Sequence, residues 1–383
     1  MKIKFSLAAT LVAALPLTAF AEDGVVPESI TFGQVAAFDG PAAALGSGMN
    51  DGIQAAFAEA NAAGGVHGRK LMLVAEDDGY EPDRSIAAVN EMINSGSIFG
   101  LIGPVGTPTS KATQPIATNA GVPFIGPFTG AGFLRDEALT NVANVRATYA
   151  AETEAWIKYL VDEQGMKDIA ILYQDDGFGR VGLAGVNAAL EQRGMSLVAE
   201  GTYTRNTTAV KSALLEIRKA KPDAVVMVGA YKHIAEFIKL SRKLKFNPAF
   251  VNISFVGSAA LANELGADGT GVIISQVVPF PWDTSIPVVA QYQTAKKAVD
   301  PDAQPNFVSL EGYIVGRMTI AALEKAGPEP TRDAFMKAIQ SMSSFDLGGA
   351  VLSYGPGDNQ GLDNVFMTEI TAHGTFAPLQ GPE

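Results

Sequence analysis

Segments typical of β-strands alternate with segments typical of helices along most of the chain, and this alternation limits the fold more than any other feature. Strands separated by single helices favour parallel sheets with helices on both faces. In a first set we expect strands at residues 29–36, 69–76, 98–102 and 122–125 and helices at 49–63, 83–95 and 109–119. In a second set we expect strands at 168–174, 195–201, 223–228, 249–253 and 271–277 and helices at 149–164, 180–193, 207–219 and 232–243. Two such sets predict an α/β protein with two lobes built on parallel sheets.

The chain after Pro279 follows a different pattern. We expect helices around residues 286–299, 308–326 and 331–341, followed by Gly-, Asp- and Asn-rich strands. Too few strands remain for a third doubly wound domain, so these helices should pack back on the first lobe. The predicted first lobe therefore comprises residues 24–146 and 279–350, and the second comprises residues 147–278 and 351–383.

The first 21 residues are typical of an export signal. Lys2 and Lys4 precede an apolar stretch, and Ala19-Phe20-Ala21 resembles a cleavage site between small residues. The alternative is a membrane anchor, but an apolar stretch of about 16 residues that contains Pro16 falls short of the ~20 residues of a spanning helix. We expect this signal peptide to be cleaved, which would leave a protein without a membrane anchor in the periplasm of a Gram-negative bacterium.

Composition excludes several classes of function. The chain has 28 Lys and Arg against 40 Asp and Glu, and a net charge of −12 disfavours nucleic-acid binding. It has no cysteine, which excludes disulfides, thiolate nucleophiles, zinc–cysteine sites and thiol-linked lipid anchors. The three histidines, at positions 67, 233 and 373, lie far apart in the sequence without a second metal-type ligand beside them. We therefore predict no metal site.

One segment resembles a dinucleotide-binding fingerprint. Residues 177–182 match G-x-G-x-x-G after a strand, and Glu200 lies where a ribose-binding acid would be expected. Asp175 and Asp176, however, immediately precede the first glycine and would repel a pyrophosphate. We favour glycines that pack a tight strand–helix turn. Since the chain also lacks H-E-x-x-H, G-x-S-x-G and Walker lysine motifs, we predict no cofactor and no enzyme, with an exported dehydrogenase as the alternative.

A short segment occurs twice. LVAEDDGY (73–80) and ILYQDDGF (171–178) both place Asp-Asp-Gly-aromatic after a strand. Either the two lobes are related, or turn-forming residues match here by chance.

Loops at the carboxyl ends of the strands are the expected ligand site, because two facing lobes form a cleft there. Thr107 is a natural N-cap before Pro108, which would leave the N–H groups of Thr109 and Ser110 free for an anion; the alternative is an ordinary capped helix end with water. The neighbouring loop 126–132 offers hydroxyl, aromatic and backbone contacts. Aromatic residues at strand ends are either part of the site or part of the lobe core. The candidates from both lobes are Phe38, Thr107, Phe128, Thr129, Gly130, Phe178, Tyr231 and Ser254.

At these loops the chain resembles periplasmic branched-chain amino-acid-binding proteins, the type I substrate-binding proteins of ATP-driven (ABC) importers. The resemblance covers essentially the whole chain after the signal. It implies two Rossmann-like lobes, three crossovers between them and a cleft that closes by a hinge. The segments that carry it are ITFGQVAAFDGPAAALG, EANAAGGVHGRKLMLVAEDD, LIGPVGTPTS, GVPFIGPFTG, IAILYQDDGFGRVGLAG, PDAVVMVGAY and NFVSLEGYIVGR.

The resemblance also implies roles for single residues in the first lobe. Thr107 matches a hydroxyl residue, and Phe128 a backbone contact, that hold the ligand carboxylate. Gly130 lies where leucine-type members have a threonine, which Thr129 would replace.

In the second lobe the resemblance implies aromatic contacts and one departure. Tyr231 matches a family tyrosine, and Phe178 matches an aromatic position that is usually tyrosine. Ser254 stands at the place of the acid that holds the ligand ammonium, and its lack of charge weakens the case for an α-amino acid. Glu311 either compensates from another loop or is an acid near a helix terminus.

We therefore expect a monomeric, exported binding protein for a small carboxylate-bearing ligand, a branched-chain or related amino acid, which it presents to an inner-membrane ABC permease. The alternatives are a ligand that is an organic, keto or aromatic acid, and a ligand-sensing receptor domain.

Overall fold

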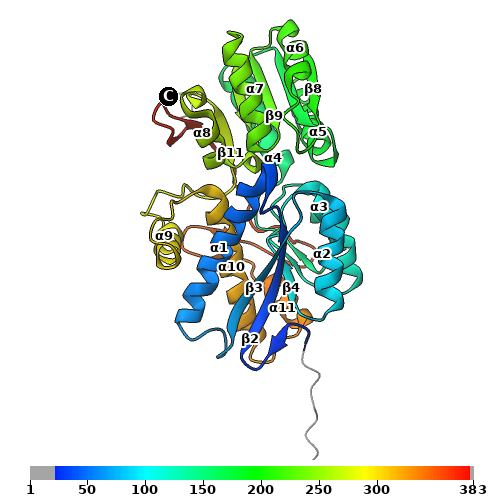
Figure 1. Ribbon diagram of the computed structural model, residues 1–383, viewed down its shortest axis with the longest axis vertical. Coiled ribbons are helices and arrows are strands. Elements are labelled where there is room, and N and C mark those ends of the chain that lie inside the picture. Colours follow the sequence, from blue (N-terminus) through cyan, green and yellow to red (C-terminus); the bar gives the residue numbers. More distant parts are fainter. Residues whose placement is uncertain (1–21, 380–383) are drawn as a thin grey trace, which may run out of the picture.

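The computed structural model describes residues 22–379, which form two lobes joined near α4 (Figure 1). The predicted signal, residues 1–21, lies outside the described residues. Between Glu22 and Leu379, no helix has the length and apolar character needed to cross a membrane.

Lobe 1 is built on a six-stranded sheet. Strand β2 pairs in parallel with β3 and β4, β4 pairs in parallel with β5, and β5 with β6. Only β1 runs antiparallel, at the start of β2. The strands are β1 (Val25–Val26), β2 (Ser29–Ala36), β3 (Lys70–Asp77), β4 (Gly100–Ile102), β5 (Phe124–Ile125) and β6 (Val142–Ala143).

Lobe 2 is built on a seven-stranded sheet in the order β15-β14-β11-β10-β9-β7-β8. The predicted parallel pairing holds from β8 to β11. Strand β14 pairs antiparallel with β11 because the chain returns to this edge from the other lobe, and β15 pairs antiparallel with β14. The strands are β7 (Ile169–Gln174), β8 (Ala199–Tyr203), β9 (Ala224–Val228), β10 (Ala249–Asn252), β11 (Ile273–Gln276), β14 (Phe366–Ile370) and β15 (Phe376–Pro378).

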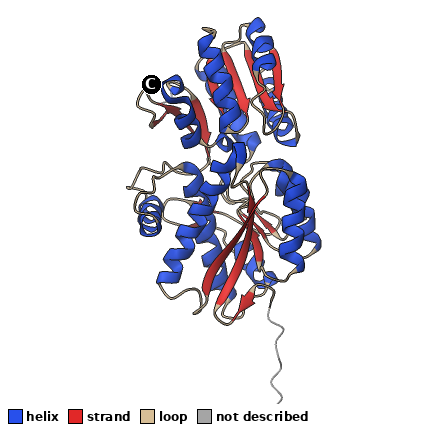
Figure 2. Ribbon diagram, viewed as in Figure 1, coloured by secondary structure: helices blue, strands red, loops and turns tan. Residues whose placement is uncertain are grey.

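Helices cover both faces of each sheet (Figure 2). The helices of lobe 1 are α1 (Ala43–Ala62), α2 (Pro82–Asn94), α3 (Thr107–Asn119), α9 (Pro287–Val299), α10 (Phe307–Ala326) and α11 (Arg332–Gln340). The last three pack on lobe 1, as predicted. Helix α10 packs so closely against α1 that a Cβ added at Gly312 would meet the carbonyl of Met49. Helix α1 begins earlier than the predicted residue 49, since its Gly- and Ala-rich first turns are typical of a loop.

The helices of lobe 2 follow the predicted order with shifted ends. They are α4 (Tyr149–Ile157), α5 (Gly177–Glu191), α6 (Lys211–Ala220), α7 (Tyr231–Lys243) and α8 (Ser258–Leu265). The predicted helix 149–164 changes at Lys158 into a π-helical turn, Lys158–Glu163. Helix α6 starts at Lys211 rather than at 207, because the Thr207 N–H donates back to the carbonyl of Thr204 in a preceding turn.

The chain passes between the lobes three times, after β6, after β11 and before β14. Before the third crossing, β13 (Val351–Leu352) pairs with β12 (Phe345–Asp346). The Tyr354 hydroxyl then donates to the carbonyl of Asn144, and the N–H of Leu362 donates to the carbonyl of Val145. The lobe boundaries stay a prediction, and these contacts favour a third crossing after Leu362 over one at residue 351.

Candidate functional site

Three hydroxyl groups gather where the N-terminus of α3 meets the loop after β5. The Oγ1 atoms of Thr107 and Thr129 lie 2.7 Å apart, and both residues are buried. The Tyr149 hydroxyl lies beside them and is fully buried; both threonine hydroxyls are near enough to act on its pKa, but it makes no hydrogen bond of good geometry among the described residues. Burial raises the pKa of Tyr149, so its hydroxyl keeps its proton near neutral pH and can donate. This group can therefore bind an anion that also meets the positive end of the α3 dipole.

Gly130 and Tyr149 are fitted to each other. The Tyr149 N–H donates to the Gly130 carbonyl at 2.8 Å. A Cβ at position 130 would lie 2.6 Å from Cδ1 of the tyrosine ring, which is closer than packed atoms allow. A threonine therefore has no room at position 130. The hydroxyl beside this position comes from Tyr149 instead.

Arg135 supports the same loop from behind. Its guanidinium donates to the carbonyl oxygens of Thr129, Ala131 and Arg146 at 2.9–3.0 Å and to Oε1 of Gln360 at 2.8 Å. Burial and the charge of Arg146 lower the pKa of Arg135 to about 10, so it remains a cation at neutral pH. All these acceptors are neutral oxygens, so the positive charge behind the Thr129 loop favours an anion in front of it.

A second buried group surrounds Arg146 in the first crossing. Its guanidinium makes two 2.8 Å hydrogen bonds to the Glu311 carboxylate, donates to Ser254 Oγ at 3.1 Å and lies 4.0 Å from the ring centroid of Phe128. Burial works to lower the pKa of Arg146, but the Glu311 carboxylate outweighs it and holds the pKa above its ordinary value. Arg146 is therefore a cation at neutral pH, held against the Glu311 carboxylate.

Glu152 on α4 completes this group. Its carboxylate accepts hydrogen bonds from the Ser254 N–H at 2.8 Å, from Ser254 Oγ at 2.9 Å and from Ser275 Oγ at 2.5 Å. Burial raises the pKa of Glu152, although Arg146 and the hydrogen bonds from Ser275 and Ser254 act to lower it. Both acids near Ser254 are thus already bound by protein groups.

Aromatic rings from both lobes meet between these polar groups. Phe255 of lobe 2 lies 4.7 Å from Phe178 in its own lobe and 5.4 Å and 5.9 Å from Phe128 and Tyr80 in lobe 1, measured between ring centroids. The four rings are at most 1% exposed. The adjacent cavity, lined by residues of both lobes that include Phe128, Arg146, Ser254 and Glu311, has a volume of about 10 Å³. That volume suits a water molecule and not an amino acid, so the described form is tightly closed.

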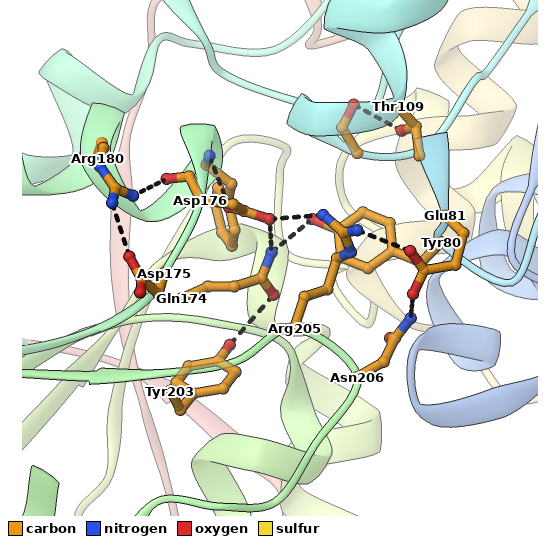
Figure 3. A network of polar contacts seen from close by, with 12 residues as sticks. Tyr80, Glu81, Thr109, Gln174, Asp175, Asp176, Arg180, Tyr203, Arg205 and Asn206 are labelled. Carbon is orange, nitrogen blue, oxygen red and sulfur yellow. Dashed lines mark hydrogen bonds and ion pairs between the residues drawn. The ribbon is translucent and has the colours of Figure 1, made fainter. Parts of the chain in front are cut away.

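A polar network crosses between the lobes near these rings (Figure 3). Arg205, in the loop after β8, donates to the Glu81 carboxylate of lobe 1 at 2.7 Å and to the Asp176 carboxylate of its own lobe at 3.0 Å. Asn206 donates to Glu81 at 2.7 Å and to the Gly79 carbonyl at 3.0 Å. The Gln174 side chain of lobe 2 lies 3.5 Å from the Tyr80 hydroxyl of lobe 1.

The two Asp-Asp-Gly-aromatic segments lie on opposite sides of this network. In each, the second aspartate accepts a hydrogen bond from the backbone N–H of the aromatic residue: Asp78 from Tyr80 at 2.7 Å, and Asp176 from Phe178 at 2.9 Å. The repeated residues therefore form the same local hydrogen bond in both lobes.

Comparison with known proteins identifies the family. A family model described as periplasmic binding protein matches residues 29–375. The chain belongs to this family. The solved structure of a possible leucine/isoleucine/valine-binding protein from Rhodopirellula baltica is 37% identical, covers 94% of this chain and 98% of its own, and has a TM-score of 0.87. The Leu/Ile/Val-binding protein BraC3 of Rhizobium johnstonii is 27% identical over 91% of this chain and 92% of the relative. The leucine-specific-binding protein of Salmonella typhimurium is 22% identical over 97% and 99%.

Membership in this family confirms the predicted two-lobed α/β fold and the resemblance stated from the sequence. Because the family consists of binding proteins, it also confirms that the chain is not an enzyme. Two of the three glycines at 177–182 have a packing role: a Cβ at Gly179 would meet the Gln174 backbone and one at Gly182 would meet Val228, whereas one at Gly177 would meet nothing within 4 Å. Within residues 22–379, no cluster of metal-type side chains is suited to hold an ion.

The structure changes details of the predicted anion site. Gly106, not Thr107, precedes α3 as its N-cap, because the Thr107 hydroxyl pairs with Thr129 and does not cap the helix. The N–H of Ser110 donates to the Gly106 carbonyl and is not free. The Phe128 N–H likewise donates to the carbonyl of Pro104, so this residue faces the site with its ring and not with its backbone.

The other predicted residues divide between the groups. Phe178 joins the aromatic cluster, and Ser254 and Glu311 both join Arg146, so Glu311 is more than an acid near a helix terminus. Tyr231 accepts a long hydrogen bond, 3.4 Å, from the Ala44 N–H of lobe 1. Phe38 is half-buried, and its N–H donates to Asp77.

Sequence reasoning missed Arg146, Tyr149, Glu152 and Arg205. The first three follow β6, a strand of two residues that is too short to show a strand end in the sequence. Arg205 lies in a Thr- and Asn-rich turn that is typical of solvent-exposed loops. The sequence nevertheless contained a signal for Arg205. Asp176 and Glu81 each stand at the start of a helix, and two acids brought together between facing lobes require a cation.

Proposed function

We propose that this protein is the exported solute-binding component of an ABC importer and that it holds a small carboxylate-bearing ligand between its lobes. One observation carries the proposal: the Tyr149 hydroxyl is buried without a partner beside the Thr107–Thr129 pair at the start of α3. A buried hydroxyl without a partner is costly, and a carboxylate oxygen would satisfy it. The cation of Arg135 behind the same loop supports a negative ligand.

A branched-chain or related amino acid is the first ligand class that we propose. The similar proteins named as Leu/Ile/Val-binding support this class, and the aromatic rings of Tyr80, Phe128, Phe178 and Phe255 would enclose an apolar side chain. A cavity of about 10 Å³ cannot hold such a ligand, so the lobes must separate for it to enter and then close around it with the four rings further apart than in the described form. Hinge closure is therefore part of the proposal.

A small carboxylic acid without an ammonium group is the second candidate. Ser254 is uncharged, and the two nearby acids are already engaged: Glu311 with Arg146, and Glu152 with hydroxyl and backbone donors. An ammonium group would need a charged partner in so dry a site. We also propose that the protein lies in the periplasm after cleavage of residues 1–21 and releases its ligand to an inner-membrane permease; both points rest on the family. A monomeric state completes the proposal.

Thermal shift of the mature protein, residues 22–383, tests both candidates. We expect stabilisation by L-leucine, L-isoleucine or L-valine, or by their 2-oxo counterparts, because a ligand that binds only the folded state raises the melting temperature. Stabilisation by the 2-oxo acids alone would select the second candidate. If no carboxylate in either set stabilises the protein while the corresponding primary amides do, the carboxylate proposal is wrong.

Tyr149→Phe tests the site itself. The variant loses a donor to a charged ligand, so affinity should fall about ten-fold or more. Its stability without ligand should stay equal or rise, since the hydroxyl has no partner to lose. Tyr173→Phe, which removes a hydroxyl on the outer side of lobe 2, is the matched control and should leave affinity unchanged. Unchanged affinity in Tyr149→Phe would remove this residue from the site.

A further inference from the structure

Arg205 links the two lobes at the edge of the proposed ligand site, where its guanidinium carbon lies 5.9 Å from the ring centroid of Tyr80. It belongs to lobe 2, and its Nη2 atom lies 2.7 Å from Oε2 of Glu81, which immediately precedes α2 in lobe 1. Its Nη1 atom lies 3.0 Å from Oδ2 of Asp176 in its own lobe. Figure 3 shows the guanidinium between the two carboxylates. One cation therefore serves an acid of each lobe.

The residues on both sides of this link lie in turns with an uncommon backbone conformation. Tyr80 and Asn206 both have a positive φ, 63° and 58°, which is uncommon outside glycine and costs conformational energy. In lobe 1, the Asp78 carboxylate fixes the turn by accepting from the Tyr80 N–H and from Ser85 Oγ. In lobe 2, Asn206 donates to Glu81 and to the Gly79 carbonyl. Glu81 thus receives two donors from the opposite lobe.

The charges suit a contact that forms and breaks. The side chains of Arg205 and Glu81 are 21% and 43% exposed, so water can solvate both when the lobes part. Arg205 keeps Asp176 as a partner in its own lobe, so opening leaves no buried charge without a partner. A pair at this exposure contributes modestly and is weakened by salt.

We propose that Arg205 is a latch that holds the lobes closed through Glu81 and so slows opening. It is a positioning residue that acts through its contacts with Glu81, Asp176 and the face of Tyr80. The effect on lobe opening does not depend on the identity of the ligand; the consequence that ligand release is also slowed rests on the proposed function.

The cysteine-free chain permits a direct test. Cysteines introduced at Ala87 on α2 and Ser212 on α6, both exposed and neutral, carry spin labels whose separation reports the distance between the lobes in the ligand-free protein. In this background we expect Arg205→Gln and Glu81→Gln each to raise the ratio of open to closed molecules about two- to five-fold. The double variant should add little to Glu81→Gln, because that change already alters the acceptor of both Arg205 and Asn206, and its excess over Arg205→Gln measures the Asn206 contact. Sodium chloride at 1 M should raise the ratio in the parent and change it little in Arg205→Gln.

Arg180→Gln is the matched control. It removes the same charge from the same lobe, but Arg180 pairs with Asp175 inside that lobe (Figure 3). Its open fraction should equal that of the parent. An open fraction in Arg205→Gln equal to that of the parent, or an equal rise in Arg180→Gln, would overturn the latch. Neither result would bear on the carboxylate proposal, which the thermal-shift experiment tests separately.

Discussion

Two arginines connect the lobes in contrasting surroundings. Arg146, in the first crossing, is 1% exposed and holds Glu311 of lobe 1, 3% exposed, through two hydrogen bonds, while it also donates to Ser254 of lobe 2. Arg205, at the edge of the contact between the lobes, meets Glu81 through a single hydrogen bond in partly exposed surroundings. Both pairs join an arginine to a glutamate, and they differ in how deeply their side chains are buried.

The difference separates a permanent link from a reversible one. Parting a buried pair leaves a charge that water does not reach, and this costs several kcal/mol. Parting an exposed pair costs little, because water replaces the partner. Arg146 and Glu311 both lie on the lobe 1 side of the first crossing, so their pair stays intact when the lobes part, while we propose that the contact at Arg205 opens and closes.

Breaking the buried pair should give the largest effect. Glu311→Gln keeps the size of the side chain but leaves the Arg146 cation without its carboxylate. We expect the free energy of unfolding to fall by about 3–5 kcal/mol. Urea unfolding followed by circular dichroism at neutral pH measures the change.

Replacing both partners is the control for this prediction. Arg146→Met with Glu311→Leu removes both charges together and should recover most of the lost stability, because well-packed apolar residues avoid the desolvation cost. A double variant as unstable as Glu311→Gln would mean that the hydrogen bonds to Ser254, and not the ion pair, hold this region together.

Arg205→Gln should behave in the opposite way. Its free energy of unfolding should change by less than about 1 kcal/mol, since the pair is partly exposed. The same variant should nevertheless shift the distance between the lobes. If it destabilised the protein as much as Glu311→Gln does, Arg205 would be a structural residue and the contrast between the two arginines would fail.

The sequence predicts the layered architecture well because buried parallel strands are continuous apolar runs, such as Ala224–Val228. The short strands are different. β5 and β6 have two residues each, so no periodicity marks their ends. The antiparallel direction of β14 is set by the third crossing of the chain, and local residues do not encode it.

The candidate site divides in the same way. Thr107 and Thr129 could be predicted because hydroxyl residues stand out in Gly- and Pro-rich loops at strand ends. Tyr149 could not, because its role depends on the space left by Gly130, nineteen positions earlier in the chain. Arg146 and Glu311 pair across 165 positions, and no local pattern joins them.

Acid should open the latch, and this is the smallest effect that we predict. Partial burial acts to raise the pKa of Glu81, but the hydrogen bonds from Arg205 and Asn206, with the nearby charges of Arg205 and Arg84, hold it below its usual value. A lowered pKa in the closed form means that the stabilising contribution of Glu81 is complete above about pH 4.3, the ordinary value for glutamate, and is lost as the pH falls through the lowered pKa. The open fraction measured by the spin labels should therefore rise below that pH in the parent and stay flat in Glu81→Gln. An equal rise in Glu81→Gln would show that other acids cause the opening and that the Arg205–Glu81 contact does not control closure.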